Sequence, residues 1–400
     1  MRLPATNRRA FIPLLLAQFL SALGDNALLV AAIGLLSENA APAWMTPALR
    51  ICFYLAFVLL GVFAGAFADA FAKSRIVTVT NLIKLAGCAL LLVGVHPLLA
   101  YALVGMGASA YAPARYGMLS ELLPNAELVL ANAWIEVSGM FSILAGVALG
   151  GLLVVPTLQI AGLGTPARSA CAGIAGVYAL ASLAALAIPR GTACDPLALA
   201  HPGAMLRNFI RSSRILWRDQ RASQAMAVTS VFWAIAAALQ FLVLRWAETV
   251  LHLPLSQAAL LQCALALGIV GGAVAAARLV PLAAATATVP AGLGIGVLII
   301  AMQLVSTPWA GTVILVLIGI LAGLLLVPMN ALLQTRGSRI LQPGQSIAVQ
   351  NFYENLAALA VLALYGGLTM AGISLNAMVT GFGAVILCAT GVMMRGAKRR

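Results

Sequence analysis

An acidic side chain lies near the middle of a long, mostly apolar stretch close to the start of the chain. Asp25 stands between Gly24 and Asn26 within residues 18–30. An ionised side chain at the centre of a bilayer costs about 2.5 kcal/mol or more, so a carboxylate there marks a binding or transport pathway by default. The alternative is a structural role, in which Asp25 pairs with a neighbouring helix or caps a break beside Gly24.

Two later segments carry further polar groups in apolar surroundings. Arg115 follows Pro113 in a segment rich in Gly, Ala and Ser. The proline is expected to kink this helix and to present Arg115 toward the interior or toward the helix end. Asn132 and Glu136 are four residues apart, so they share one helix face. These side chains are candidates for binding a charged or polar ligand.

The composition places these groups in a membrane protein. Of the residues, 63% are hydrophobic and only 8% are charged, and the mean hydropathy is +1.05. That leaves too few polar side chains to cover the surface of a soluble protein. A helix needs about 20 apolar residues to cross the hydrocarbon core. We predict twelve membrane-spanning helices, with a tight turn near Gly372 before the last, at about residues 11–36, 48–72, 76–95, 98–120, 128–156, 165–188, 222–247, 255–280, 284–305, 309–335, 346–371 and 373–394.

The basic residues are distributed as the positive-inside rule requires. If the N-terminus is cytoplasmic, only Arg50, Arg168 and Arg245 of the 23 Lys and Arg residues fall on the outer side. An even number of spans then places both termini in the cytoplasm. The basic residues behind the net charge of +13 therefore set the topology and contact anionic lipid. Nucleic-acid binding is excluded because the chain has no room for a folded basic surface. The predicted inner set is Arg2, Arg8, Arg9, Lys73, Arg75, Lys84, Arg115, Arg190, Arg207, Arg211, Arg214, Arg218, Arg221, Arg278, Arg336, Arg339, Arg395, Lys398, Arg399 and Arg400.

The sequence offers no residue set for catalysis or for metal binding. The three His residues lie far apart in predicted loops, and the six Cys residues are scattered without a CxxC pair. A lipid enzyme embedded in the membrane would need a nucleophile with its base, or a metal, at membrane depth. We therefore predict no cofactor and no enzymatic activity.

A short turn after the second predicted span combines small, acidic and basic residues. Gly65 and Asp69 end that span, and Lys73 and Arg75 precede the next one. The segment resembles the GxLADRxGRR signature between helices two and three of the major facilitator superfamily, with alanine at two signature positions. This resemblance implies a cytoplasmic gate, in which the acid and the bases hold helices together without touching substrate. The alternative is an ordinary turn that carries positive-inside charges.

The segment 189–221 separates the sixth and seventh predicted spans. In its second half, arginines recur at steps of three and four residues, with apolar side chains on the opposite face. This pattern predicts a basic amphipathic helix that lies in the cytoplasmic interface against anionic headgroups. A solvated linker that obeys the charge rule is the alternative. The arginines are Arg207, Arg211, Arg214, Arg218 and Arg221, and the apolar face carries Met205, Phe209 and Leu216.

An internal repeat divides the chain into two halves. Residues 113–119 match 328–334 at an offset of 215, and residues 130–136 match 348–354 at an offset of 218. Each half thus has a Pro-containing helix followed by a helix bearing Glu, which predicts two six-helix bundles related by an axis along the membrane normal. The predicted units are a first bundle at 1–188, the linker at 189–221 and a second bundle at 222–400.

The repeat also gives Asp25 a counterpart. The offset of 215 places Gln240 at the corresponding position of the second half. Asp25 and Gln240 are expected to face each other across the interface of the halves, where transporters of this architecture bind substrate. Arg245 lies five residues further along, toward the outer end of the same helix.

Four motifs extend the resemblance over nearly the whole chain. Residues 18–29, 113–122, 327–337 and 348–355 together resemble the bacterial lysophospholipid transporters of the major facilitator superfamily. The resemblance implies an all-α major facilitator fold of twelve transmembrane helices in two pseudo-symmetric six-helix bundles, in the bacterial inner membrane. It also implies that lysophospholipids such as lyso-phosphatidylethanolamine move from the outer to the inner leaflet. There a partner acyltransferase, with acyl carrier protein, would restore the second acyl chain. The protein itself lacks the HxxxxD pattern of such enzymes. We expect it to be a monomer.

The resemblance also assigns roles to the candidate residues. Asp25 would hold the ammonium of the headgroup or a cation, while Arg115 or Arg245 would meet the phosphate. Members of the family carry Arg where this chain has Gln240, so a direct salt bridge to Asp25 is lost, and Arg245 is a candidate replacement. They carry Lys where this chain has Arg115, which keeps the charge and adds bidentate geometry. The predicted substrate-binding or translocation residues are Asp25, Asn26, Arg115, Asn132, Glu136, Gln240, Arg245, Asn330, Gln350, Asn351 and Glu354.

A second function within the same superfamily stays open at this point. In a cation-coupled exporter of drugs or metabolites, Asp25 would carry a proton. That function predicts transport of water-soluble substrates that collapses with the proton gradient.

Overall fold

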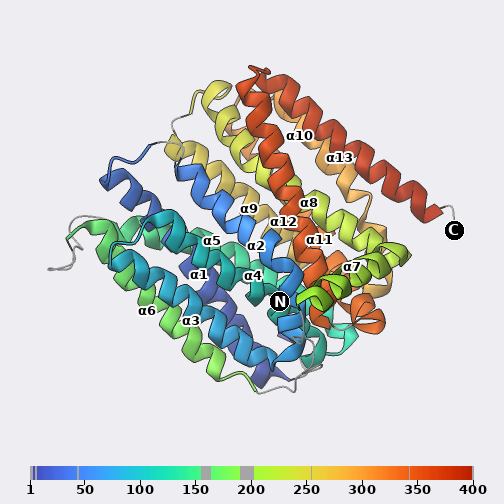
Figure 1. The fold of residues 1–400 in the computed structure, drawn as a ribbon. Helices are drawn as coiled ribbons and strands as arrows, with labels where there is room; N and C mark the ends of the chain where they lie inside the picture. Colours follow the sequence, from blue (N-terminus) through green and yellow to red (C-terminus); the bar gives the residue numbers. More distant parts are fainter. Residues whose placement is uncertain are drawn as a thin grey trace.

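Long helices make up the fold in the computed structural model, which describes residues 3–4, 7–42, 45–154, 164–189, 202–253, 255–341 and 343–398. Helices suit a membrane-spanning chain because lipid offers no hydrogen-bond partners to the backbone. In a helix, the backbone donors and acceptors are satisfied within the segment itself. The thirteen α-helices of the described residues are shown in Figure 1. They are α1 (Arg8–Glu38), α2 (Met45–Ala70), α3 (Lys73–Leu92), α4 (Pro97–Leu122), α5 (Leu128–Leu153), α6 (Pro166–Leu186), α7 (Pro202–Arg218), α8 (Gln220–Thr249), α9 (Leu255–Leu279), α10 (Ala291–Ala301), α11 (Pro308–Ile340), α12 (Pro343–Met370) and α13 (Leu375–Lys398).

The described residues contain eleven helical segments that are long and apolar enough to cross a membrane. The prediction of twelve is therefore not confirmed. The span predicted at 98–120 does form a helix, α4, but this helix is not among the eleven. Its sequence includes Arg115, Glu121 and many Gly, Ala, Ser and Tyr residues, which lower its hydropathy.

The span predicted at 284–305 is not one continuous α-helix. It consists of a 3₁₀ segment η3 (Leu282–Thr288), the short helix α10, and a second 3₁₀ segment η4 (Met302–Leu304). Pro290 separates η3 from α10, because proline lacks the amide hydrogen that a continuing helix would need there. The tight turn predicted before the last span is confirmed, with Gly372 at a φ of 72°.

The two halves of the chain pack their helices in the same order. In the first half, α1 packs on α5, α2 on α4 and α3 on α6; in the second, α8 packs on α12, α9 on α11 and α10 on α13. Pro113 lies inside α4 and Pro328 inside α11, so the two prolines of the sequence repeat lie in corresponding helices. Contacts of α2 with α12 and of α5 with α9 join the halves (Figure 1).

Helices α9 and α11 approach each other more closely than any side chain would allow. A Cβ atom added at Gly268 or Gly272 of α9 would collide with backbone carbonyls of α11, and one added at Gly319 or Gly323 of α11 would collide with carbonyls of α9. Small residues permit such backbone contact between helices in a membrane. The two helices therefore pack as one closely fitted pair.

The segment 189–221, in which a basic amphipathic helix is predicted, contains α7. Its arginines are exposed, while Met205 and Leu216 are buried. Ser212 Oγ donates a hydrogen bond of 2.9 Å to Gln345 Oε1, and the hydroxyls of Ser213 and Tyr353 are 2.7 Å apart, so α7 is held on α12. The helix also packs against α2. We call this end of the molecule, where α2, α4 and α11 end and α3, α5, α8 and α12 begin, the α7 end.

An ion pair fixes the start of α8 at the α7 end. Asp219 caps α8, because its Oδ1 accepts a hydrogen bond of 3.0 Å from the amide of Ala222. Its Oδ2 accepts two hydrogen bonds from Arg336 of α11, at 2.9 and 2.6 Å. The Arg336 guanidinium holds the pKa of the Asp219 carboxyl below its ordinary value. The carboxylate thus stays charged and ties α8 to α11.

Candidate functional site

A cavity of about 450 Å³ lies between the two halves, and we call it the central cavity. Helices α1, α2, α3, α4, α5, α8, α9, α11 and α12 contribute to its walls. A smaller adjoining cavity of about 220 Å³ shares many of its residues. Eight of the eleven predicted site residues line the central cavity: Asp25, Asn26, Arg115, Gln240, Asn330, Gln350, Asn351 and Glu354.

Asp25 is paired with a lysine and a tyrosine at the wall of the central cavity. Lys84 Nζ of α3 lies 2.6 Å from Asp25 Oδ2, and the Tyr178 hydroxyl of α6 donates a hydrogen bond of 2.8 Å to Oδ1. Lys84 also donates a hydrogen bond of 2.9 Å to Ser21 Oγ. Gly24 makes room for this cluster, because a Cβ atom there would lie 2.8 Å from the Tyr178 ring. The carboxylate remains 16% exposed, so it also faces the cavity.

The position of Lys84 differs from the sequence prediction. Lys84 was expected in the cytoplasmic set of basic residues, but it lies well inside α3 with 1% of its surface exposed. A buried ammonium needs a charged partner, and Asp25 supplies it. The sequence signal existed, since Lys84 falls near the middle of the span predicted at 76–95, where the positive-inside rule does not apply.

Arg115 of α4 also lines the central cavity. Its Nη1 donates to Gln18 Oε1, and its guanidinium stacks 4.1 Å from the centre of the Tyr116 ring and 6.0 Å from that of Tyr111. Its Nε and the Tyr111 hydroxyl are buried without a hydrogen-bond partner among the described atoms. Both donors are thus unsatisfied at the wall of the cavity.

Two buried glutamates complete the polar surroundings. Glu136 lines the adjoining cavity and accepts a hydrogen bond of 3.5 Å from the Tyr116 hydroxyl. Glu354 accepts a hydrogen bond of 2.7 Å from Gln350, whose amide also donates to Asn330 at 2.8 Å. The glutamates, 5% and 7% exposed, come from α5 and α12, the corresponding helices of the sequence repeat.

Arg245 does not replace the arginine that the family resemblance led us to expect beside Asp25. It is absent from the residues that line either polar cavity, and its Nη1 is buried without a hydrogen-bond partner in the described part of the chain. The reason is helical phase: five residues turn an α-helix by about 500°, so Arg245 points about 140° away from Gln240. Gln240 lines the cavity, as the repeat predicts for the counterpart of Asp25.

Asn132 connects the two halves instead of lining the cavity. Its Nδ2 donates to Gln334 Oε1 at 2.9 Å, and Gln334 Nε2 donates back to Asn132 Oδ1 at 2.8 Å. Both side chains are buried. This reciprocal amide pair joins the start of α5 to the last part of α11, close to the α7 end.

The residues predicted to form a gate also lie at the α7 end. A Cβ atom at Gly65 would meet the Ala348 side chain of α12 at 2.9 Å, so α2 and α12 are in close contact there. Lys73 pairs with Glu121 of α4, and Arg75 is exposed. The side chain of Asp69 lies outside the described residues. The contact of Gly65 with α12 fits a gate between the halves.

The central cavity combines charges of both signs with apolar walls. Asp25 and Glu354 are the acidic residues of its wall, and Arg50, Lys84 and Arg115 are the basic ones. Aromatic side chains such as Phe53 and Phe232 line other parts. Ion pairs and donors at one place, beside apolar surface, suit a ligand that has a charged headgroup and an apolar remainder.

Comparisons with known proteins agree with this description. The family model described as Major Facilitator Superfamily matches residues 14–362. The Lysophospholipid transporter LplT of Yersinia pestis (strain Pestoides F) is 40% identical over 358 residues, which cover 89% of this chain and 86% of that protein. The same values hold for LplT of Yersinia pseudotuberculosis serotype O:3 (strain YPIII).

Two solved structures have a similar fold at low sequence identity. The human organic anion transporter MFSD10 (TETRAN) gives a TM-score of 0.78 at 15% identity, covering 97% of this chain and 99% of that one. The major facilitator transporter FucP in the outward conformation gives 0.76 at 13% identity, covering 96% and 97%.

Proposed function

The chain belongs to the major facilitator superfamily and, within it, to the lysophospholipid transporters, and we propose that it moves lysophospholipids across a bacterial inner membrane. The proposed direction is from the outer to the inner leaflet, and lyso-phosphatidylethanolamine is the proposed substrate. The observation that carries the proposal is the central cavity, which holds two carboxylates and three basic side chains beside apolar walls in a chain of this family.

The headgroup of lyso-phosphatidylethanolamine matches the charges of the cavity. Its ammonium would approach the exposed side of Asp25, and its phosphate would bind Arg115, whose planar guanidinium suits phosphate oxygens. Lys84 pairs with Asp25 at 2.6 Å and would share this carboxylate with the incoming ammonium. Binding of a zwitterion leaves the net charge of the cavity unchanged, which limits the cost of transferring the headgroup from water.

The α7 end is proposed to face the cytoplasm. Exposed arginines of α7 lie there, as do Lys73 and Arg75 at the start of α3, and the positive-inside rule assigns such an end to the cytoplasm. Both termini would then be cytoplasmic. Residues 1–188 and 222–400 would be the two bundles, and their rocking about the central cavity would expose the headgroup to either side in turn.

The amide pair of Asn132 and Gln334 is expected to help keep the α7 end closed. Replacing Gln334 by Ala leaves the buried Oδ1 of Asn132 without its donor, which costs about 1–3 kcal/mol, while Nδ2 keeps its hydrogen bond to the Leu128 carbonyl. Hydrogen–deuterium exchange should therefore become faster at the start of α5 and the end of α11. Gln303→Ala, which removes an exposed hydrogen bond to Thr380, is the matched control and should change exchange little. Equal exchange in Gln334→Ala and the unmodified protein would show that the pair does not hold this end.

The product of the proposed transport is a lysophospholipid in the inner leaflet. A lysophospholipid acyltransferase that uses acyl carrier protein is the proposed functional partner, because it would restore the second acyl chain there. A protein of this kind needs no cofactor of its own for transport, and we propose that it acts as a monomer.

Uptake of labelled lipid tests the function directly. Vesicles or cells that carry this protein alone should take up labelled lyso-phosphatidylethanolamine, whereas labelled sugars and cationic drugs should stay at the background of empty vesicles. Uptake should persist when an ionophore removes the proton gradient. Transport of the drugs but not of the lipid, with collapse on addition of the ionophore, would instead establish the cation-coupled exporter.

A further inference from the structure

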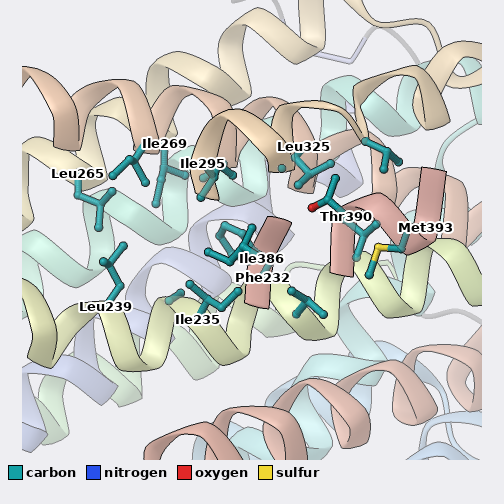
Figure 2. Close-up of a pocket in the computed structure, with 17 residues that line it drawn as sticks. Phe232, Ile235, Leu239, Leu265, Ile269, Ile295, Leu325, Ile386, Thr390 and Met393 are labelled. Atoms are coloured by element: carbon teal, nitrogen blue, oxygen red, sulfur yellow. The ribbon is translucent and has the colours of Figure 1, made fainter. Parts of the chain in front are cut away.

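A second cavity, which we call the apolar cavity, lies inside the second half of the chain. It is formed by side chains from α8, α9, α10, α11 and α13, together with Val289 just before α10, and has a volume of about 70 Å³ (Figure 2). Thr390 supplies the one polar side chain among the residues that line it. Apolar cavities of this kind stay dry and bind apolar molecules. The composition of the wall therefore points to a hydrocarbon ligand.

The apolar cavity adjoins the central cavity and shares five lining residues with it. Phe232, Ala236 and Leu239 of α8 and Leu265 and Ile269 of α9 line both. In Figure 2, Leu239 and Leu265 lie at one end of the apolar cavity, and Thr390 and Met393 lie at the other. A ligand whose polar part occupies the central cavity could thus extend an apolar part past these shared residues.

The apolar cavity is elongated along α8. Its lining residues on this helix run from Val228 to Leu239, a stretch of about 16 Å at 1.5 Å per residue. One leaflet contributes half of a hydrocarbon core that is about 30 Å thick, so this length is close to that of an acyl chain in a bilayer. From the shared residues, the cavity extends toward the α7 end, since Val228 lies nearer the start of α8 than Leu239 does.

We propose that the apolar cavity binds the acyl chain of the lysophospholipid while the headgroup occupies the central cavity. This inference rests on the proposed function and adds the binding site of the acyl chain. A lysophospholipid has one acyl chain, and the central cavity has this apolar extension within the second half. With the α7 end in the cytoplasm, the acyl chain points from the headgroup toward the cytoplasmic side. A lysophospholipid in the outer leaflet has the same orientation. A long chain fills the cavity and displaces flexible side chains such as Met393.

The preference for acyl-chain length tests where the acyl chain of the substrate binds. Ala322 of α11 is 4% exposed and lines the apolar cavity but not the central one. Ala322→Leu adds a branched side chain there, so uptake of palmitoyl lyso-phosphatidylethanolamine should fall at least about tenfold, while uptake of the hexanoyl analogue should stay within about twofold. Ala310→Leu, the same change in a half-buried part of α11 outside the cavity, is the matched control and should affect neither. Equal loss, or no loss, for both chain lengths in Ala322→Leu would overturn the proposal.

Photolabelling gives a second measurement that requires no variant. Lyso-phosphatidylethanolamine with a diazirine at the end of its acyl chain is bound to the unmodified protein and illuminated. Labels should fall on α13 near Thr390 and Met393, at the end of the apolar cavity that lies away from the residues shared with the central cavity (Figure 2). Labels on α2 and α12, between the two halves, would show that the chain stays in the bilayer and would overturn the proposal.

The two proposals fail in different ways. If the unmodified protein takes up no lysophospholipid, the proposed function is wrong. The other case is that the unmodified protein takes up lysophospholipid, but Ala322→Leu keeps the same preference for acyl-chain length and the photolabels lie outside the apolar cavity. Then only the proposed acyl-chain site is wrong.

Discussion

Replacing Asp25 by Asn is expected to reduce uptake of lyso-phosphatidylethanolamine to the background of empty vesicles while expression stays normal. Asn keeps one oxygen, which can accept the hydrogen bond from Lys84 or the one from Tyr178, because these two donors bond different oxygens of Asp25. It removes the charge that the ammonium of the headgroup needs. The loss of folding stability should stay below the about 3–5 kcal/mol that results when one partner of a buried ion pair is deleted outright. The measurement is uptake by vesicles that contain equal amounts of each folded variant.

A double variant separates binding by Asp25 from neutralisation of Lys84. Replacing a buried ion pair by neutral residues is often tolerated, so Asp25→Asn with Lys84→Met should fold at least as well as the single variant. If Asp25 binds the headgroup, this double variant remains inactive. Recovered uptake would show that Asp25 serves only to pair with Lys84. Tyr178→Phe is the matched control, because it removes one hydrogen bond to Asp25 without changing any charge, and it should lower uptake by about fivefold.

The second large effect is expected at Arg115. Arg115→Gln should raise the KM for lyso-phosphatidylethanolamine by about 30-fold or more, because removing one member of a buried charged hydrogen-bonded pair costs about 2–5 kcal/mol. Arg115→Lys keeps the charge but loses the planar contact with Tyr116 and bidentate binding of phosphate, so its KM should lie between the two. The measurement is initial uptake rate against substrate concentration.

The control for Arg115 is an arginine away from the cavity. Arg278 near the end of α9 is exposed and lines neither polar cavity, so Arg278→Gln should leave the KM unchanged. An unchanged KM in Arg115→Gln would exclude Arg115 as the phosphate ligand. Equal impairment in the Lys and Gln variants would mean that stacking on Tyr116, and not charge, is what Arg115 provides.

Much of the candidate site could be predicted because it depends on local sequence. Asp25 was recognised by its position in an apolar run, and the repeat led from it to Gln240 in the corresponding helix. Both side chains line the central cavity. A repeat conserves helical phase, so residues at equivalent positions of two related bundles face the same interface. Whether these residues bind substrate stays a prediction.

The partner of Asp25 could not be predicted from the same patterns. Lys84 and Tyr178 come from α3 and α6, and their contact with α1 depends on how three helices pack within the first half. Sequence spacing gives the face of each helix but not the neighbour that this face meets. Loop order groups Lys84 with the cytoplasmic basic residues, although it lies near the middle of a span. Nearness of Arg245 to Gln240 in sequence does not show which way Arg245 points, because five residues change the helical phase by about 140°.

The positions of the membrane-spanning segments were easier to predict than the points at which a segment stops being α-helical. Hydropathy located the segment 284–305, but its division into two 3₁₀ segments and the short helix α10 depends on where proline interrupts the hydrogen bonds. The apolar cavity could not be foreseen at all, because it results from the packing of five helices whose sequences are uniformly hydrophobic.

The close glycine contacts between α9 and α11 determine which wall of the apolar cavity can yield. Backbones that touch without intervening side chains cannot move closer or slide without collision, so this pair forms a stiff wall. The facing wall includes α10, which is eleven residues long and bounded by 3₁₀ segments, and α13 at the outside of the bundle (Figure 1). An incoming acyl chain would therefore make room by outward displacement of α10 and α13, as a pair, away from α9 and α11.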